Sequence, residues 1–433
     1  MIEQLKDRFK VFESQLNGAS KSSWHQLRTD AMEAFVNQGF PSARDEEYRY
    51  THVGRLLQKN IDFSTIANES KTGTLAKKPM FHDADATHIY VNDGVVDQDS
   101  ITNTSVDGLR ICSLKDAVKH HPQDVKNALG KYAHPSKDPF TALNTAFSLE
   151  GVFIKISKNT TLEKPIIMHY TSSSNQVSSA IQSRNLILVE QGAKAHILES
   201  YTSECEVDAF TNHVSEVVVG SNALFNYYKL QNQNNTSFHI DNTFIAQRRD
   251  SKVQAFTISL EGKMVRNNLN FQLEEENTEA HMFGLYVAHG DTHIDNHTVV
   301  DHKVANCYSN EIYKGILDDN SKGVFNGKIF VQPDAQKTNA FQSNKNILLS
   351  DTATINTKPQ LEIWADDVSC SHGCTTGQLD EEQLFYLRSR GIGKSKATAM
   401  LLHAFVNDVL DKIELDFLHD FVNDEMYNRL DQI

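Results

Sequence analysis

The chain has 433 residues, of which 39% are hydrophobic and 23% charged, and its formal net charge is −14. This length suits two or three domains with a continuous core. The acidic balance argues against nucleic-acid binding, which depends on Lys and Arg neutralising phosphates, so we expect protein partners.

The five cysteines are odd in number and mostly far apart, which does not form the pattern of a disulfide framework and favours a reducing compartment. Acidic residues interrupt every short apolar run near the N-terminus, so no signal peptide is recognisable. No stretch approaches the roughly 20 apolar residues of a membrane span. We therefore expect a soluble, cytoplasmic protein that makes no membrane contact.

The first region, residues 1–150, is predicted to be mostly helical. Apolar residues recur at helical spacing over 2–16 and 24–35, with a break at Asn17-Gly18, and this predicts a helical hairpin that Gly39 closes. Residues 89–96 form two short apolar runs around Asp93-Gly94, which predicts a β-hairpin. Residues 114–132 are predicted to be helical again.

The second region, residues 151–376, consists of short apolar or alternating runs separated by polar turns, which is typical of an all-β structure. The runs restart near Ala195, Ala223, Val253 and Ala280, at intervals of 28, 30 and 27 residues. A period of this length favours a solenoid, and we predict a right-handed parallel β-helix. An antiparallel sandwich or barrel remains the alternative, because it also gives short strands with regular turns.

The third region, residues 377–433, returns to helical patterns. Asp380 begins a first helix, Gly391 occupies the position of a C-cap glycine, and a second helix follows from Lys396. Apolar residues from Leu418 onward suggest a third helix. The fold class is thus mainly β, with a parallel β-helix between N-terminal and C-terminal helical domains.

The segment Cys370-Ser371-His372-Gly373-Cys374 is the densest cluster of soft metal ligands in the chain. In an extended strand the period of two places Cys370, His372 and Cys374 on one face. The spacing differs from that of common structural zinc sites, so further ligands would have to come from elsewhere. The alternative interpretation is a loop with partly buried cysteines and a hydrogen-bonded histidine.

Two other patterns are weaker candidates for a binding site. Residues 391–395 end in Gly-Lys-Ser like a phosphate loop, but the first glycine and the preceding strand are missing, so we predict a turn between helices. A patch rich in histidine and aspartate could hold a metal, although its members alternate irregularly and would scatter over both faces of a strand. Its residues are His281, His289, His293, His297, His302, Asp291, Asp295 and Asp301.

Several blocks together resemble the SufD branch of the SufB/SufD family of iron-sulfur cluster assembly proteins. The similarity covers most of the chain and is strongest beyond residue 300. The SufB branch is the rival assignment, but its members differ across the longest block. The similar blocks are Tyr48-Arg49-Tyr50-Thr51, residues 344–350 (Asn-Lys-Asn-Ile-Leu-Leu-Ser), residues 361–368 (Leu-Glu-Ile-Trp-Ala-Asp-Asp-Val), Cys370-Ser371-His372-Gly373 and residues 384–392 (Leu-Phe-Tyr-Leu-Arg-Ser-Arg-Gly-Ile).

This resemblance implies a subunit of the SUF assembly complex that pairs through its β-helix with the paralogue SufB. It also implies that the C-terminal helices hold the ABC-type ATPase SufC, and that the isolated chain forms a homodimer. His372 matches the family position near the nascent cluster, and Cys370 also matches the family pattern and is a candidate ligand there, whereas Cys374 stands where alanine is expected. We expect no stably bound cofactor in the isolated chain, and iron or a nascent cluster only in the complex.

Two other functions fit a β-helix. A polysaccharide lyase or hydrolase would require clustered catalytic residues and a secretion signal, and no nucleophile system stands out from the sequence. A purely architectural solenoid would tolerate replacement of Cys370 and His372. The resemblance favours a non-catalytic scaffold over both.

Overall fold

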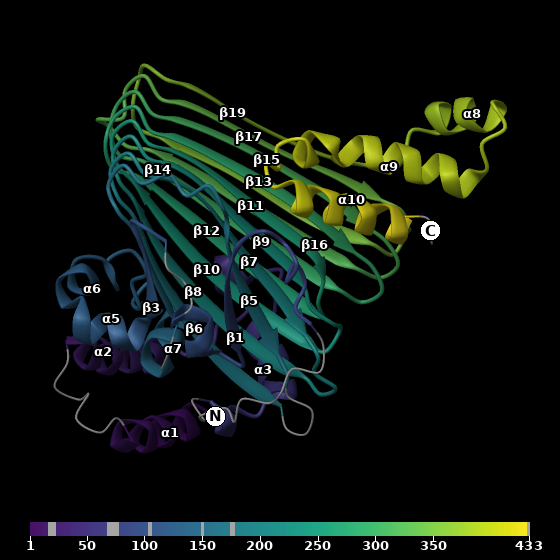
Figure 1. The fold of residues 1–433 in the computed structure, drawn as a ribbon. Helices are drawn as coiled ribbons and strands as arrows, with labels where there is room; N and C mark the ends of the chain where they lie inside the picture. The colour runs from purple at the N-terminus through teal and green to yellow at the C-terminus, as the bar shows by residue number, and fades with distance from the viewer. Residues whose placement is uncertain (16–22, 67–77, 103–105, 149–150, 174–177, 431–433) are drawn as a thin grey trace.

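The computed structural model describes residues 1–15, 23–66, 78–102, 106–148, 151–173 and 178–430, and its centre is a parallel β-solenoid of about eight turns (Figure 1). Its strands form two sheets that face each other. Sheet A has the strand order β19-β17-β15-β13-β11-β9-β7-β5-β1-β2, and sheet B has the order β18-β16-β14-β12-β10-β8-β6-β4-β3. From β4 onward, successive strands therefore alternate between the sheets, as the coils of a solenoid require.

Most strands of sheet A are nine or ten residues long. Their bounds are β1 Thr87–Asn92, β2 Val95–Val96, β5 Ile166–Ser172, β7 Lys194–Ser203, β9 Leu224–Asn232, β11 Lys252–Glu261, β13 Glu279–Ala288, β15 Tyr308–Leu317, β17 Asn339–Leu348 and β19 Ser369–Gly377. The strands of sheet B are β3 Leu109–Ser113, β4 Val152–Ile156, β6 Ser179–Val189, β8 Ala209–Val219, β10 Ser237–Gln247, β12 Met264–Leu273, β14 His293–His302, β16 Lys322–Val331 and β18 Thr354–Ile363.

One corner of the solenoid repeats the same left-handed backbone conformation in successive coils. Asn222, Asp250 and Asn277 have φ of 58°, 58° and 59°, a region that Asn and Asp tolerate better than most residues. The amide of Asn222 donates to the carbonyl of Arg249 in the next coil, and Asp250 donates to Glu276. These polar turns are those that separate the apolar runs in the sequence.

The parallel pairing confirms the predicted β-helix and excludes the antiparallel sandwich or barrel. Val253 pairs with Ala280, at the predicted interval of 27 residues. The preceding coil differs in detail, because Val253 pairs with Phe225 and not with Ala223. Ala223 is fully buried at the corner before β9. A buried apolar residue occurs both at the corner and in the strand, so the sequence pattern could not show that the strand begins after Ala223.

The N-terminal helices cover the outer face of sheet B. Helices α1 (Ile2–Gln15) and α2 (Ser23–Gln38) form the predicted hairpin, and Asn17-Gly18 lies outside the described residues. Gly39 follows α2 with φ of 69°, as expected after a helix end. Aromatic and aliphatic residues of α1, α2, α3 (Val53–Asn60) and α7 (Pro139–Phe147) share one hydrophobic core with Phe210, Phe238 and Ile240 of sheet B.

The rest of the N-terminal region contains both predicted and unpredicted elements. β1 and β2 form the predicted hairpin, with φ of 49° at Asp93 and 83° at Gly94. The predicted helix over 114–132 is two shorter helices, α5 (Leu114–His120) and α6 (Pro122–Ala128), because Pro122 begins a new helix. Helix α4 spans Gln98–Thr102, and short 3₁₀ turns span Glu46–Tyr48 and Phe63–Thr65.

Of the C-terminal helices, α9 (Lys394–Leu410) and α10 (Asp416–Leu430) lie on the outer face of sheet A, whereas α8 (Glu381–Ser389) stands apart from it (Figure 1). Leu402 and Val406 of α9 and Leu418 of α10 are fully buried in a core with outward side chains of sheet A such as Ile258 and Leu285. Lys314 of β15 donates to the carbonyl of Phe405 and pairs with Asp408, both at 2.5 Å.

The division into domains at residues 150 and 376 stays a prediction. Strands β1, β2 and β3 precede residue 150 and extend both sheets, and α9 and α10 share a core with sheet A. None of the helices in the described part of the chain is long and apolar enough to cross a membrane.

Candidate functional site

The Cys-Ser-His-Gly-Cys segment lies on β19, the last strand of sheet A. β18 is the last strand of sheet B, so the final coil of the solenoid has no further coil on one side. We call the exposed edges of β18 and β19, with the side chains between them, the open end. Exposed strand edges carry unpaired backbone donors and acceptors and are ready to pair with another chain.

The strand geometry brings three predicted ligands to one face. Cys370, His372 and Cys374 alternate along β19 and pair with Ala340, Gln342 and Asn344 of β17. Those three β17 residues are buried and face the inside of the solenoid. The three ligands therefore point toward the interior side of the open end, where no following coil covers them.

The three ligands differ in exposure. Cys370 is half-buried against the small core around Val331 and Ala340, and burial raises the pKa of its thiol. His372 and Cys374 are exposed. A Cβ placed on Gly373 would meet no atom within 4 Å, which leaves room for a ligand or another chain to approach the backbone.

Two buried residues, Gln342 and Glu311, lie in line with His372 on the next two strands of sheet A. Gln342 pairs with His372 in the ladder, and Glu311 pairs with Gln342 one coil deeper. Nε2 of Gln342 donates to Oε2 of Glu311 at 2.7 Å. Burial raises the pKa of Glu311 to about 7, so this carboxyl group titrates near neutral pH beneath the open end.

The predicted histidine-aspartate patch does not form one site. His281 is on the outer face of sheet A, His293 and His297 are on the outer face of sheet B, and His302 points inward to Ser309 at 2.9 Å. His289 lies in the turn after β13. The irregular spacing scatters the rings, as the pleat of the strands predicts.

His293 and His297 instead help to attach the segment Glu46–Thr51 to sheet B. Oγ1 of Thr51 lies 2.8 Å from Nε2 of His293 and donates to Oδ2 of Asp295 at 2.6 Å. Glu47 contacts Nδ1 of His297 at 3.3 Å and forms a short ion pair with Lys328. These contacts connect the N-terminal region to the late coils of the solenoid.

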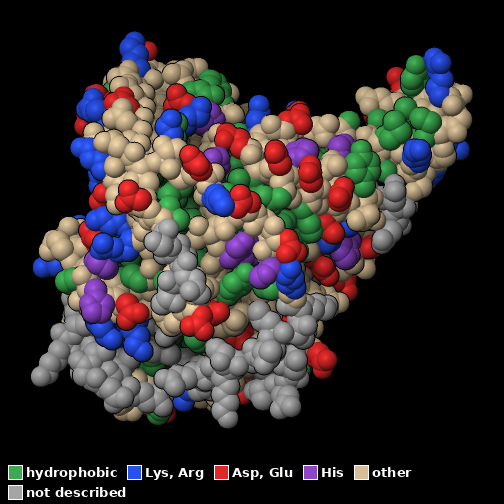
Figure 2. Space-filling view, viewed as in Figure 1, with side chains coloured by type: hydrophobic (Ala, Val, Ile, Leu, Met, Phe, Trp, Pro, Cys, Tyr) green, Lys and Arg blue, Asp and Glu red, His purple; other side chains and the backbone are tan. Residues whose placement is uncertain are grey.

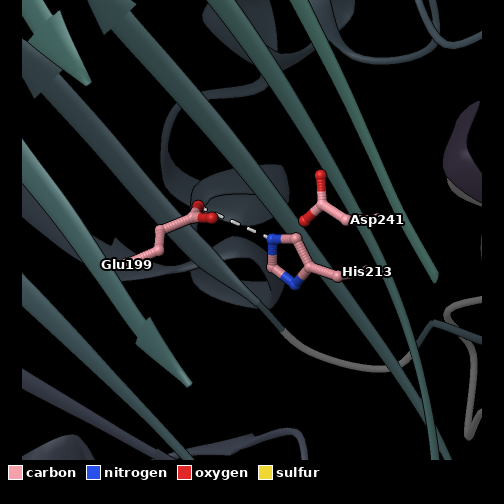
Figure 3. Close-up of side chains that lie close together, drawn as sticks. All are labelled: Glu199, His213 and Asp241. Carbon is pink, nitrogen blue, oxygen red and sulfur yellow. Dashed lines mark ion pairs between the residues drawn. The ribbon is translucent and has the colours of Figure 1, made fainter. Parts of the chain in front are cut away.

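A cluster inside the solenoid was not identified from the sequence. Glu199, His213 and Asp241 are fully buried, and one ligand atom from each lies within 4.8 Å of the others (Figure 3). The only sequence signal is the interval between His213 and Asp241, which pair directly on β8 and β10. Glu199 comes from the opposite sheet, and no periodicity connects it to them.

The C-terminal helices leave apolar side chains in solvent. Helix α8 buries none of its residues, and Phe385 and Tyr386 are 74% and 57% exposed. Figure 2 shows this part of the chain as an arm that stands away from the body. Of the predicted turn at residues 391–395, residues 391–393 lie between α8 and α9, with φ of 85° at Gly391 and Gly393 as the N-cap of α9, whereas Lys394 and Ser395 are the first residues of that helix.

Comparison with known proteins places these features in a family. The sequence profile of the SUF system FeS cluster assembly, SufBD core domain, matches residues 169–405, and that of the SufBD protein N-terminal region matches residues 1–168. An iron-sulfur cluster assembly SufBD family protein of Synechocystis, slr0076, is 32% identical over 93% of this chain and 90% of its own length. The iron-sulfur cluster assembly protein SufD of Escherichia coli is 30% identical over 88% of this chain and 87% of its own length. A chloroplast protein of Arabidopsis thaliana, ABCI7, is 29% identical over 92% of this chain and 85% of its own length.

Proposed function

The chain belongs to the SufBD family of SUF-system iron-sulfur cluster assembly proteins, and from this premise we propose that it is the SufD-type scaffold subunit of a cytoplasmic assembly complex. In this role it performs no catalysis of its own. It pairs with a SufB-type paralogue, holds a SufC-type ATPase, and contributes side chains where iron and sulfide are first combined.

The observation that carries the proposal is the open end. The unpaired edges of β18 and β19 suit the addition of strands from another chain, and a paralogue with the same coil would offer matching edges. Cys370, His372 and Cys374 lie at this edge and face the interior side. Ligands from the partner would complete a cluster site that three residues of one strand cannot close.

The same edge supports the homodimer proposed for the isolated chain. Without the paralogue, the edges of β18 and β19 would pair with those of a second copy, because exposed edges favour any compatible strand. Addition of the paralogue should then convert the homodimer into a heterodimer, which size-exclusion chromatography with light scattering can follow.

Helix α8 supports the proposed ATPase contact. Its exposed Phe385 and Tyr386 are the aromatic residues that commonly anchor protein interfaces. Energy for assembly would then come from the partner, in keeping with the incomplete phosphate-loop pattern at residues 391–395. A cytoplasmic location fits five free cysteines and a process that requires reduced sulfur.

The decisive experiment is co-expression with the SufB-type and SufC-type proteins of the same organism. We expect a stable complex that accumulates iron and acid-labile sulfide under anaerobic conditions. The His372→Ala complex should assemble normally and fail to mature a target iron-sulfur protein. Normal maturation by His372→Ala would contradict the role of the open end, and absence of any complex would contradict the scaffold proposal.

A further inference from the structure

The interior cluster brings together side chains from both sheets. Glu199 extends from β7 of sheet A, while His213 and Asp241 pair in register on β8 and β10 of sheet B. Figure 3 shows the three side chains converging in the space between the sheets. Nε2 of His213 lies 3.6 Å from Oε1 of Glu199. All three side chains are fully buried, or nearly so.

A second histidine, His239, lies beside Asp241, outside the group of three whose ligand atoms are all within 4.8 Å of one another. Nδ1 of His239 lies 2.8 Å from Oε1 of Gln233, and an amide oxygen only accepts hydrogen bonds, so Nδ1 carries the hydrogen. Nε2 of His239 is then a bare lone pair. A neutral ring held in this way by a carbonyl group is the form in which histidine binds metals.

Three buried atoms in and beside this cluster have no hydrogen-bond partner. They are Nδ1 of His213, Nε2 of His239 and Oδ2 of Asp241, and the last two lie 3.9 Å apart. Leaving such atoms unpaired in a protein interior costs free energy. Oδ2 of Asp241 is therefore available to a bound ion.

The charges of the cluster favour a cation. Glu199 and Asp241 place two buried carboxyl groups in one interior cluster. The ammonium group of Lys229 already contacts Asp241 and donates to Oγ1 of Thr243 at 2.7 Å. This interior site therefore holds two carboxylates next to a positive charge.

We propose that Glu199, His213 and Asp241 form a binding site for a divalent first-row metal ion inside the solenoid, with Lys229 occupying the cation position when no ion is bound. One imidazole with two carboxylates is a donor set suited to ferrous iron and to zinc. The preference for ferrous iron rests on the proposed function, whereas the site itself rests on the geometry.

Metal binding is tested in a full-length parent variant that lacks the ligands of the open end, Cys370→Ser/His372→Ala/Cys374→Ser. The variant is refolded anaerobically with Fe²⁺, Zn²⁺ or Co²⁺ in separate samples and desalted, and metal is counted by mass spectrometry. We expect about one ion per chain, and Co²⁺ should show the ligand-field absorption of nitrogen and oxygen donors. Refolding is used because buried ligands exchange metal slowly. Less than a tenth of an ion per chain with all three metals would overturn the proposal.

Isosteric variants locate the bound ion. In the parent variant, Glu199→Gln and Asp241→Asn should each weaken binding by about 100-fold, at the upper end of the losses known for metal-site substitutions. Glu311→Gln is the matched control, because Glu311 is also a buried interior carboxyl group but lies in a later coil. Equal binding by Glu199→Gln and Glu311→Gln would place the metal elsewhere and refute the site.

Lys229→Met tests whether the cluster is a metal site or whether Lys229 and Asp241 form only a structural ion pair. Without metal this variant should melt earlier than the parent, since Asp241 loses its cation. Added Zn²⁺ should restore the melting temperature, and should bind at least about 10-fold more tightly than to the parent, because no ammonium competes. A destabilised variant that Zn²⁺ does not restore would show that Lys229 and Asp241 form only a structural ion pair. Failure here leaves the scaffold function untouched, since that function is judged by complex formation and by maturation with His372→Ala.

Discussion

Gln342 donates a hydrogen bond of 2.7 Å from its Nε2 to Oε2 of Glu311. Gln342 also lies next to His372 in the ladder between β17 and β19. A fully buried carboxyl group with a pKa near neutrality thus lies two coils from the solvent at the open end, separated from His372 by one amide side chain.

Glu311 should make the stability of the protein depend on pH. Its pKa is about 7 in the folded chain and 4.5 as an ordinary value, so the folded state binds more protons between these values. The free energy of unfolding should therefore fall as pH rises from about 4.5 to 7, by a contribution on the order of 3 kcal/mol. Glu311→Gln should remove this contribution and be the more stable protein at pH 8. Urea unfolding of both proteins at pH 5 and pH 8 measures this contribution. If the free energy of unfolding changes equally between pH 5 and pH 8 in Glu311→Gln and in the unmodified protein, Glu311 is not the group responsible.

His372→Ala should separate folding from function. His372 is exposed on an edge strand, so its removal should change the free energy of unfolding by about 1 kcal/mol or less. Maturation of a target protein should be lost, while the complex still forms. Cys374→Ala is the matched control on the same face of β19, and it should retain more activity than His372→Ala if Cys374 is not a required ligand.

Removal of the exposed aromatic residues of α8 should weaken the capture of the SufC-type ATPase. Phe385→Ala/Tyr386→Ala removes side chains that make no buried contact within the chain, so the melting temperature should be unchanged. Loss of central aromatic anchors typically costs 2 kcal/mol or more in binding, roughly a 30-fold rise in Kd. Calorimetric titration with the purified ATPase measures this.

Met400→Ala, on the exposed face of α9, is the control for a general loss of apolar surface. Undiminished binding by the double variant would show that the ATPase contacts another surface. Point variants are preferable to truncation at Gly377, because α9 and α10 cover the apolar outer face of sheet A and their loss would expose it.

Glu216→Gln should strongly destabilise the fold. Glu216 pairs with Arg184 at 2.6 Å, with both side chains fully buried, and accepts from the backbone amides of Gly130, Tyr132 and Ala133. The variant leaves the charge of Arg184 uncompensated, which typically costs about 3–5 kcal/mol. Chemical unfolding of Glu216→Gln beside the exposed control Glu163→Gln tests this, with a loss below about 0.5 kcal/mol expected for the control.

The sequence by itself determined the coil. The polar turns at Asn222, Asp250 and Asn277 recur because each coil must turn at the same corner, so the parallel solenoid could be predicted from their spacing. The period of two likewise placed Cys370, His372 and Cys374 on one face. Local patterns could do this because a strand and a turn are decided by neighbouring residues.

Only the tertiary structure decided which side chains meet across the two sheets. Glu199 approaches His213 through the interior, and Glu311 lies below His372, but the intervals between coils vary and no sequence rule aligns one sheet with the other. The separation of His293 and His297 from His302, in contrast, followed from the sequence, since odd and even positions on a strand point to opposite faces. Contacts between residues distant in sequence depend on how the coils stack, and stacking is set by the packing of the whole solenoid.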